Sequence, residues 1–537
     1  MRGRMGKNRN YTLLFKFILL FAAMTSLQLG GQARAQQSTP ATLYVATTGS
    51  DTNPGTVAAP LLTIQQAVNL AKPGDTVIVA DGTYGPNGHY TCGDICSQNG
   101  YAAPVVFYNS GTASAPITIT AQNKWGAILD CNLPYGYAGN GTDGVQACDT
   151  YFDFQGNASY IIIQDFQITR GYWSGSNVNG ANNHNVKFLR NHFHDIGNRH
   201  YVVPSGAESY GIVGVYAGTP TSYLIFDGNI FNNIGRLPTS GQGATDYNHD
   251  HGLYIYNGPY TITNNLFYNN TAGWGIQVSP GTHDTSIRNN TFAYKNPQQD
   301  GQIMLWGNNS NITIENNIFY EPRNYAIGTW QASETNTLID TNIICCSGVG
   351  VIDSAGTRSA ISNDPLNVDP MFVAPANFDF RLQSTSPAID TGLTIPSITT
   401  DLDGVLRPQG LGYDLGAYEG PIAGVAPTPT PAPAPTPSTT FATSTSTDSV
   451  ALSKHQSAIV GVNVSLVSGS AQAVIFAVAG LPPGVKASWS SASCLLSCSS
   501  NLKLWISSHA GTGTSVITLT TTVAGISEPV SVILTVQ

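Results

Sequence analysis

The sequence predicts an all-β chain in which a right-handed parallel β-helix is followed by a small β-sandwich. Three observations support this prediction. One short pattern, apolar alternation followed by Asn, any residue and Phe, recurs between residues 159 and 344. A Pro- and Thr-rich linker spans residues 423–440, and short alternating runs then recur over residues 441–537. Recurrence of one pattern every few dozen residues is the signature of a solenoid.

The first repeat has the period of a strand. Apolar and polar residues alternate in the runs that start at Tyr260 and Ser310, which indicates strands rather than helices. From a degenerate copy at Phe166 the copies lie 27, 38, 36, 25, 27 and 25 residues apart, and about 25 residues hold three short strands and three turns. The repeated Asn residues, which we expect to stack as an interior ladder, are Asn191, Asn229, Asn265, Asn290, Asn317 and Asn342.

A second repeat follows each Phe and contains a small residue preceded by a larger one. Its small residues are Gly211, Gly252, Gly275, Gly301, Ala326 and Gly350. This alignment sets Tyr210, His251, Trp274, Asp300 and Tyr325 in one column. Because neighbouring coils lie about 4.8 Å apart, the column would be a strip of aromatic rings with a His and an Asp among them. A shift of one residue at Asp300 would turn its side chain to the other face.

The start of the chain and its composition indicate an exported protein. Residues 1–35 combine a basic start, an apolar run from Leu13 to Met24 and an A-x-A site ending at Ala35, as in a secretory signal peptide. We expect the mature chain to begin near Gln36, with no membrane span because the apolar run is short. The net charge of −9, without a basic patch, gives no indication of nucleic-acid binding. We expect a monomer.

The eight cysteines of an exported chain are expected to pair. Proximity favours the disulfides Cys92–Cys96, Cys131–Cys148 and Cys494–Cys498. The adjacent Cys345 and Cys346 are left unassigned. Zinc binding is the alternative, but no His lies at ligand spacing from these cysteines.

Residues 42–85 carry a family resemblance. A strand and a loop rich in Gly, Asn and Pro lead to a predicted helix over Thr63–Ala71, then to G-D-T-V and G-T-Y. This order resembles secreted right-handed β-helix proteins of the pectin-lyase-like superfamily, and the resemblance extends to about residue 420. It implies that the helix caps the open end of the solenoid. The D-P-x-F, S-P-A-I-D-x-G and D-x-G-A-Y-E motifs of residues 364–420 resemble the closing segment of such proteins, expected at the far end of the solenoid.

The C-terminal region has a different pattern. Its short alternating runs with turns between them indicate a β-sandwich. The run that starts at Leu481, LPPGVKASWS, resembles bacterial immunoglobulin-like modules appended to exported enzymes. The region shows no catalytic cluster, so binding, spacing and attachment to a cell surface all remain open for it.

Candidate functional residues gather in long insertions on adjacent coils, residues 197–209 and 235–250, where solenoids usually carry function. Most of the histidines lie near these insertions. The catalytic candidates are His194, Asp195, Arg199, His249, Asp250 and His251, and the metal candidates are Asp246 and Asp250. Structural interpretations stay open: His251 as a hydrogen-bonded turn residue, and Asp195 as one step of a polar column with Asn233 and Asn269.

These residue types suit a polysaccharide substrate. Tyr210, Trp274, Tyr325 and Trp306 offer flat faces for sugar rings, with Asp300 beside them. A lyase acting on uronate sugars must neutralise the carboxylate and remove the neighbouring proton. His249 or His251 would be the base, Arg199 the carboxylate partner, and Asp246 and Asp250 would bind calcium. Lys187 and Lys295 are alternative bases.

Other reactions remain open because the superfamily fold hosts lyases, hydrolases, epimerases and non-catalytic surface proteins. A hydrolase needs two carboxylates about 5–9.5 Å apart, for which Asp195, Asp246, Asp250 and Asp300 are candidates. The catalytic patterns of pectate lyases, polygalacturonases and alginate epimerases are not found in the sequence. We therefore predict an exported polysaccharide-degrading enzyme, a lyase ahead of a hydrolase. The alternatives are a non-catalytic carbohydrate-binding or surface protein and a uronate epimerase.

Overall fold

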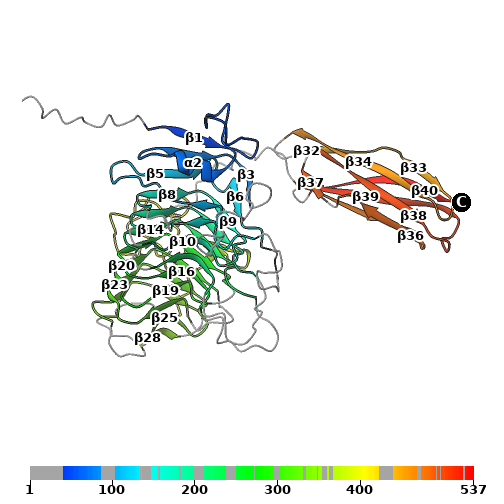
Figure 1. Ribbon diagram of the computed structural model, residues 1–537. Coiled ribbons are helices and arrows are strands. Elements are labelled where there is room, and N and C mark those ends of the chain that lie inside the picture. The colour runs from blue at the N-terminus through cyan, green and yellow to red at the C-terminus, as the bar shows by residue number, and fades with distance from the viewer. Residues whose placement is uncertain are drawn as a thin grey trace, which may run out of the picture. The chain divides into compact units, whose positions relative to one another are not determined.

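The computed structural model describes two compact units, within residues 1–425 and 426–537. Figure 1 shows both. The described residues are 40–85, 103–133, 135, 147–154, 158–180, 183–198, 211–218, 221–237, 249–270, 273–294, 301–330, 334–346, 349–353, 360–361, 367–421, 440–468, 473–491, 493–495, 497–523 and 526–537.

The first unit is a β-helix of three parallel sheets, to which successive coils contribute strands in the order A, C, D. Sheet A contains β1 (Thr42–Val45), β2 (Thr76–Val79), β5 (Ile117–Ala121), β8 (Ile161–Gln164), β11 (Val186–Leu189), β14 (Leu224–Asp227), β17 (Tyr260–Thr263), β20 (His283–Arg288), β23 (Ser310–Glu315), β26 (Leu338–Asp340) and β29 (Ala360–Ile361). Sheet C contains β3 (Gly82–Tyr84), β6 (Ala127–Asp130), β9 (Gln167–Thr169), β12 (His192–His194), β15 (Ile230–Asn232), β18 (Leu266–Tyr268), β21 (Thr291–Ala293), β24 (Ile318–Tyr320) and β27 (Ile343–Cys345). Sheet D contains β4 (Val105–Val106), β7 (Phe152–Asp153), β10 (Ser174–Val178), β13 (Val213–Ala217), β16 (His251–Ile255), β19 (Ile276–Val278), β22 (Ile303–Trp306), β25 (Tyr325–Trp330) and β28 (Val349–Asp353).

The predicted Asn ladder lies between sheets A and C. All six amides are fully buried. The side-chain oxygen of Asn265 accepts from the backbone N–H of Asn229 at 2.9 Å and from its amide at 3.0 Å, and Asn290 accepts from Asn265 in the same way. Because buried amides are costly unless every polar atom is paired, the ladder ties each coil to the next.

The residue before each ladder Asn makes the turn itself. These residues have positive φ and are Arg190, Gly228, Asn264, Asn289, Asn316 and Thr341. The left-handed region disfavours most side chains but tolerates Asn and Gly. Where the repeat has two successive Asn residues, the first therefore makes the turn and the second hydrogen-bonds to the neighbouring coils.

The Phe of each repeat fills the interior. Phe231 and Phe267 stack with ring centroids 4.8 Å apart, and Phe267 and Phe292 stack at the same distance. One continuous apolar core runs from Val45 to Ile344. One coil leaves its apolar side uncovered, so burial is obtained by stacking coils.

The N-terminal end carries the predicted helix, α2 (Ile64–Leu70). Thr63 is its N-cap, and its hydroxyl accepts from the N–H of Gln66, which satisfies one of the free amide groups at a helix start. Ile64, Ala67 and Val68 are buried, and the helix packs against β1, β2 and β4. The core at this end is thereby covered.

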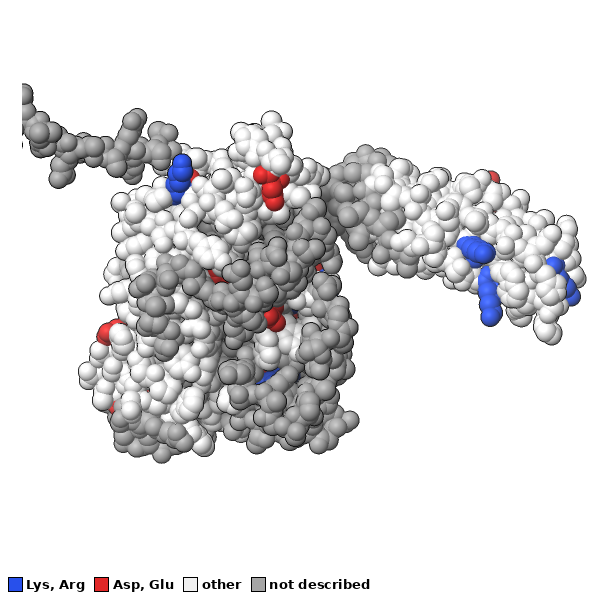
Figure 2. Space-filling view, viewed as in Figure 1, with Lys and Arg blue, Asp and Glu red and all other residues white. Residues whose placement is uncertain are grey.

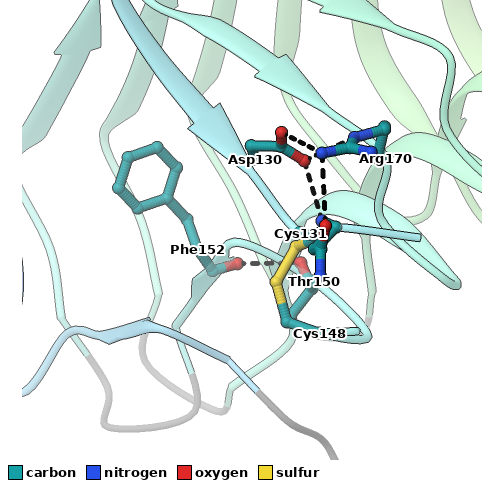
Figure 3. Close-up of a disulfide and its surroundings, with 7 residues drawn as sticks. Asp130, Cys131, Cys148, Thr150, Phe152 and Arg170 are labelled. Carbon is teal, nitrogen blue, oxygen red and sulfur yellow. Dashed lines mark hydrogen bonds and ion pairs between the residues drawn. A yellow bond between two sulfur atoms is a disulfide. The ribbon is translucent and has the colours of Figure 1, made fainter. Parts of the chain in front are cut away.

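Two disulfides are described in the β-helix. Cys131 and Cys148 are bonded with Cα atoms 4.8 Å apart, as predicted, beside the Asp130–Arg170 ion pair (Figure 3). The adjacent Cys345 and Cys346, which the sequence left unassigned, are bonded to each other. The predicted Cys92–Cys96 pair lies outside the described residues, and Cys498 is disulfide-bonded.

The closing segment does not lie at the far end of the solenoid, so that prediction is wrong. Residues 367–421, with β30 (Phe372–Ala374), a 3₁₀ turn (Pro375–Asn377) and β31 (Asp379–Leu382), pack on the outer face of sheet C. Phe372 and Phe380 join an apolar cluster with Leu266, Ile318 and Ile343 of that sheet. The outer face of sheet C is apolar in these coils, so this segment buries surface that a bare sheet would expose to water.

The second unit has its own core and two sheets. The four-stranded sheet has the order β32 (Thr440–Thr445), β34 (Ser457–Ser468), β38 (Cys498–Ile506) and β36 (Val485–Trp489). The five-stranded sheet has the order β33 (Ser449–Leu452), β40 (Ile526–Val536), β39 (Gly513–Val523), β35 (Ala473–Ala479) and β37 (Ser493–Leu495). All pairs except β33–β40 are antiparallel. The inner faces share a separate apolar core, as expected for a small sandwich.

None of the helices in the described part of the chain is long and apolar enough to cross a membrane.

Candidate carbohydrate site on sheet D

The register of sheet D corrects the predicted aromatic column. His251 pairs with Val213, so Val213, not Tyr210, stands beside it. Ile303 pairs with both Ile276 and Ile327, which sets Gly301, not Asp300, between Trp274 and Tyr325. The sequence alignment had the wrong register at these two coils because the small residue of the repeat does not occupy the same strand position in each coil.

The outer face of sheet D carries a second row that the sequence analysis missed. Paired positions along it are Tyr216, Tyr254, Gln277, Met304 and Gly328. The inward neighbours on β16, Leu253 and Ile255, belong to the core, so Tyr254 points outward. The signal for this row was Tyr216 in the run at Tyr210 and Tyr254 in the run at His251.

Two tryptophans extend this face at the end of the strands. Trp306 and Trp330 are directly paired in register. The Trp330 side chain is 56% exposed, and neighbouring parallel strands lie about 4.8 Å apart. A pair of rings at this spacing is a suitable platform for sugar rings. Tyr325, predicted to bind substrate, is largely buried at 9% exposure.

His251 lies in an aromatic stack. Its ring lies 5.3 Å from that of Tyr254 and 5.4 Å from that of Trp274. Its Nδ1 accepts from the backbone N–H of Trp274 at 3.1 Å, so the neutral ring carries its hydrogen on Nε2. Among the buried polar atoms of the described residues, His251 Nε2 and Trp274 Nε1 are two that have no hydrogen-bond partner. Two unpaired N–H donors in one stack are costly, and both are buried, with no exposed surface on His251.

Three tyrosines adjoin this stack. The hydroxyls of Tyr254 and Tyr256 are 2.8 Å apart, and the Tyr216 ring lies 5.7 Å from that of Tyr254. Burial raises the pKa of Tyr254 well above its usual range. Burial also lowers the pKa of His251 well below its usual range, with the charges of His249 and Arg236 adding to the effect. At neutral pH the face thus presents a protonated phenol beside a neutral imidazole.

Asp250, predicted to be catalytic or to bind metal, makes contacts of a structural kind. It forms an ion pair with Arg236 in which neither side chain has exposed surface. The guanidinium donates to both carboxylate oxygens, at 2.6 and 3.0 Å, and the backbone N–H of Ile212 also donates at 2.9 Å. These contacts use the lone pairs that a metal ion or a proton would need.

His194 and Asp195 lie at sheet C, so they do not join the residues of sheet D. His194 Nδ1 is 2.7 Å from Asp195, and its Nε2 is 3.2 Å from the amide oxygen of Gln167. Asn233 donates to Asp195 at 2.9 Å, and Asn269 in turn donates to Asn233 at 2.6 Å. This is the polar column considered as the alternative for Asp195, and it connects the turns of three coils.

The remaining predicted residues divide into two groups. Arg199, Tyr210, Asp246 and Asp300 lie outside the described residues, as does Lys295. His249 is exposed, at the end of the 235–250 insertion and two residues before the aromatic stack. Lys187 lies on β11 of sheet A, in the column that contains Thr261, and therefore away from the aromatic face.

The described residues do not fit a calcium ion at this face. The carboxylate of Asp153 on β7 is buried and lies 3.4 Å from the amide of Asn177, and Asp250 is occupied by Arg236. The one cluster of three potential metal ligands in the described part of the chain is Cys345, Cys346 and Asp369, with both sulfurs joined as a disulfide. Calcium favours several carboxylate and carbonyl oxygens together, and the described residues of this face do not supply such a set.

Comparison with known proteins agrees with the fold. Residues 43–244 match the family described as Pel9A-like, right handed beta helix region, and residues 244–366 match the right handed beta helix region family. Together with the three parallel sheets, these matches show a right-handed parallel β-helix, the fold of the pectin-lyase-like proteins that the sequence resembles.

The chain is similar in sequence to pectate lyases. Pectate lyase L of Dickeya chrysanthemi is 22% identical over 422 residues, which cover 71% of this chain and 91% of the relative. Pectate lyase PEL9 of Emericella nidulans is 28% identical over 144 residues, 27% of this chain and 32% of the relative.

Solved structures give weaker similarities. The crystal structure of pectate lyase Pel9A aligns with a TM-score of 0.36 at 16% identity, covering 72% of this chain and 97% of that one. A rhamnogalacturonan lyase aligns with a TM-score of 0.41 at 14% identity, over 61% and 87% of the two chains. The sequence similarity to pectate lyases, and not these alignments, makes the first unit a polysaccharide-lyase-like β-helix.

Proposed function

We propose that this protein is an exported polysaccharide lyase that cleaves a uronate-containing polymer by β-elimination on the outer face of sheet D. The observation that carries the proposal is the aromatic face itself. Trp306, Trp330 and Tyr254 offer surfaces for sugar rings, and Tyr254 stacks on the buried ring of His251. The similarity to pectate lyases over most of the β-helix supports the same reaction class.

The chemistry requires one proton acceptor and one proton donor. His249, exposed beside the stack, takes the proton from the ring carbon that bears the carboxylate. The electron pair of that bond forms a carbon–carbon double bond, and the neighbouring bond to the glycosidic oxygen breaks. Tyr254, kept protonated by its raised pKa, supplies the proton to that oxygen. Arg199 stays the proposed partner of the substrate carboxylate.

A hydrolase is less well supported. It needs two free carboxylates about 5–9.5 Å apart. Of the four predicted candidates, Asp250 is enclosed by Arg236 and Asp195 accepts hydrogen bonds from two amides at sheet C. The other two, Asp246 and Asp300, lie outside the described residues.

The test incubates the chain with polygalacturonate, alginate and a neutral xylan. Ultraviolet absorbance of the unsaturated uronate product and new reducing ends are followed together, with calcium and then with chelator. The expected result is that absorbance and reducing ends rise together on a polyuronate. Loss of activity with chelator would mean that the reaction needs a metal ion that the described residues do not bind. Ends without absorbance would mean hydrolysis. No change in absorbance or in reducing ends on any of these polymers would contradict the lyase proposal and favour a non-catalytic binding protein.

A further inference from the structure

The outer face of the four-stranded sheet in the second unit combines an exposed aromatic ring with two lysines. Trp505 on the central strand β38 is 39% exposed. Lys486 on β36 pairs directly with Trp505, and Ser457 on β34 pairs with it from the other side. Lys503 lies two residues before Trp505 on the same face. An exposed Trp between two cations is an unusual use of a sandwich surface, where large apolar side chains normally face the core.

The alternation of buried and exposed residues along β38 shows that these side chains lie on one face of the sheet. Ser500, Leu502, Leu504 and Ile506 are buried, while Ser499, Asn501, Lys503 and Trp505 are exposed. Ile459 on β34, 62% exposed, pairs with Lys503. The face therefore contains a ring, an aliphatic side chain, two ammonium groups and short polar side chains, side by side on two central strands and one edge strand.

Its charge differs from that of the whole protein. The second unit carries Lys454, Lys486 and Lys503 against Asp448 and Glu528, while the whole chain has a net charge of −9. Glu528 belongs to β40 of the other sheet, and Asp448 lies between β32 and β33. In the view of Figure 2 the second unit shows blue lysine side chains and hardly any red. Within its described residues, this face carries positive charges only.

We propose that this face binds an anionic polysaccharide, with Trp505 stacking on a sugar ring and Lys486 and Lys503 pairing with carboxylates on neighbouring sugars. Stacking alone would serve any sugar, but two lysines around the ring select carboxylated sugars by charge complementarity. Because Lys486 pairs with Trp505, the aromatic ring and the ammonium group are close enough to contact the same sugar or adjacent sugars of a polymer. A flat face, rather than a pocket, suits a long chain in which several sugars are contacted weakly. The site is separate from sheet D and carries no catalysis.

The inference goes beyond the proposed lyase function and stands on different residues. It gives the second unit a role that its sequence left open, namely holding the chain on the polymer. Two weak sites joined in one chain raise the effective concentration of the second at its target. Binding does not require turnover, so the two proposals can fail independently.

The test measures binding by the full chain in a background that lacks the two paired tryptophans of sheet D, Trp306→Ala with Trp330→Ala. Affinity gels or calorimetry compare polygalacturonate, fully methyl-esterified polygalacturonate and dextran. The background chain is expected to bind polygalacturonate and to bind its methyl ester at least about tenfold more weakly. Because surface charge attraction is screened by salt, binding to polygalacturonate should also weaken as salt is added.

Added substitutions assign this binding to the face. Trp505→Ala is expected to weaken it about tenfold or more, and Lys486→Ala with Lys503→Ala to abolish the preference over the methyl ester. Lys72→Ala removes one positive charge from an exposed site in the β-helix, and Tyr108→Ala removes an exposed ring there, so both should leave affinity unchanged. Thermal unfolding verifies that each variant is folded.

Three results would overturn the proposal: no binding by the background chain, full affinity after Trp505→Ala, or equal affinity for the methyl ester. A wild-type chain that binds polygalacturonate but releases no unsaturated product would contradict the lyase proposal alone.

Discussion

Tyr254 is the residue on which the proposed chemistry depends most directly. The Tyr254→Phe variant keeps the ring and its stacking with His251 but removes the phenolic proton. We expect the turnover rate on a polyuronate to fall about 10²–10⁴-fold, the usual contribution of a general acid, with an unchanged melting temperature. Steady-state assays of unsaturated product check this.

Tyr223→Phe is the matched control, because Tyr223 is 58% exposed and precedes β14 of sheet A. It should retain full activity. Equal loss in both variants, or none in Tyr254→Phe, would remove Tyr254 from the mechanism.

Asp250 separates a structural role from a catalytic one. Asp250→Asn leaves the fully buried Arg236 guanidinium without its counter-charge. Breaking a buried pair from one side costs about 3–5 kcal/mol, so we expect the free energy of unfolding of the β-helix to fall by that amount in urea titrations. Lost activity with unchanged stability would return Asp250 to the catalytic candidates.

The pKa of His192 predicts how the stability of the β-helix depends on pH. Burial, and then the charge of His194, lower the pKa of His192 to about 4 from its usual 6.5, although Asn232 and Asp195 act in the opposite direction. The unfolded chain therefore binds the proton first as the pH falls. The stability present above about pH 6.5 is lost progressively down to about pH 4.

Urea unfolding of the wild type and of His192→Gln across this pH range is the measurement. The variant should show a shallower decline, because it lacks the group that titrates. Parallel curves would mean that the pKa of His192 is not lowered in the folded protein.

At the scale of the element, the Asn ladder should be far more sensitive than the turns outside it. Asn265→Ala removes the acceptor of the Asn229 N–H and the donor to the Phe226 carbonyl. Each buried group left unpaired costs about 1–3 kcal/mol, so we expect a loss of about 3 kcal/mol or more in unfolding free energy.

Asn269→Ala is the comparison, since Asn269 belongs to the exposed column and donates to Asn233. Its loss should cost about 1 kcal/mol, the ordinary value of one hydrogen bond. Equal losses for the two substitutions would mean that the interior ladder has no special weight.

The elements with a strict local pattern were the ones that could be predicted from sequence. The Asn and Phe repeats, the helix capped by Thr63 and the Cys131–Cys148 pair all depend on short-range spacing. The register at Tyr210 and Asp300 could not be fixed, because insertions of different length precede these coils and the small residue of the repeat does not keep one strand position. The buried partner of Asp250 was also not identifiable, since Arg236 lies 14 residues away in sequence within a long insertion.

At the scale of the whole molecule, two separate cores predict two unfolding events. The apolar clusters of the β-helix and of the sandwich share no residue, and such units usually unfold independently. Calorimetry of the full chain is therefore expected to show two transitions. Leu504→Ala, a fully buried change in the sandwich worth about 2–5 kcal/mol, should shift one transition and Asn265→Ala the other. A single transition that moves with either substitution would refute this independence.

The segment on the outer face of sheet C has a consequence for how the solenoid can vary. Thr400 accepts from Asn264, Asp414 accepts from Asn289, and Leu393 bonds both ways with Asn316, so consecutive coils are held by one continuous stretch of fixed length. Coils of a bare solenoid can be gained or lost in whole units with little effect on their neighbours. Here an added coil would put every later turn out of reach of the residue in the segment to which it is hydrogen-bonded. The fixed length of the segment therefore fixes the number of coils that it covers.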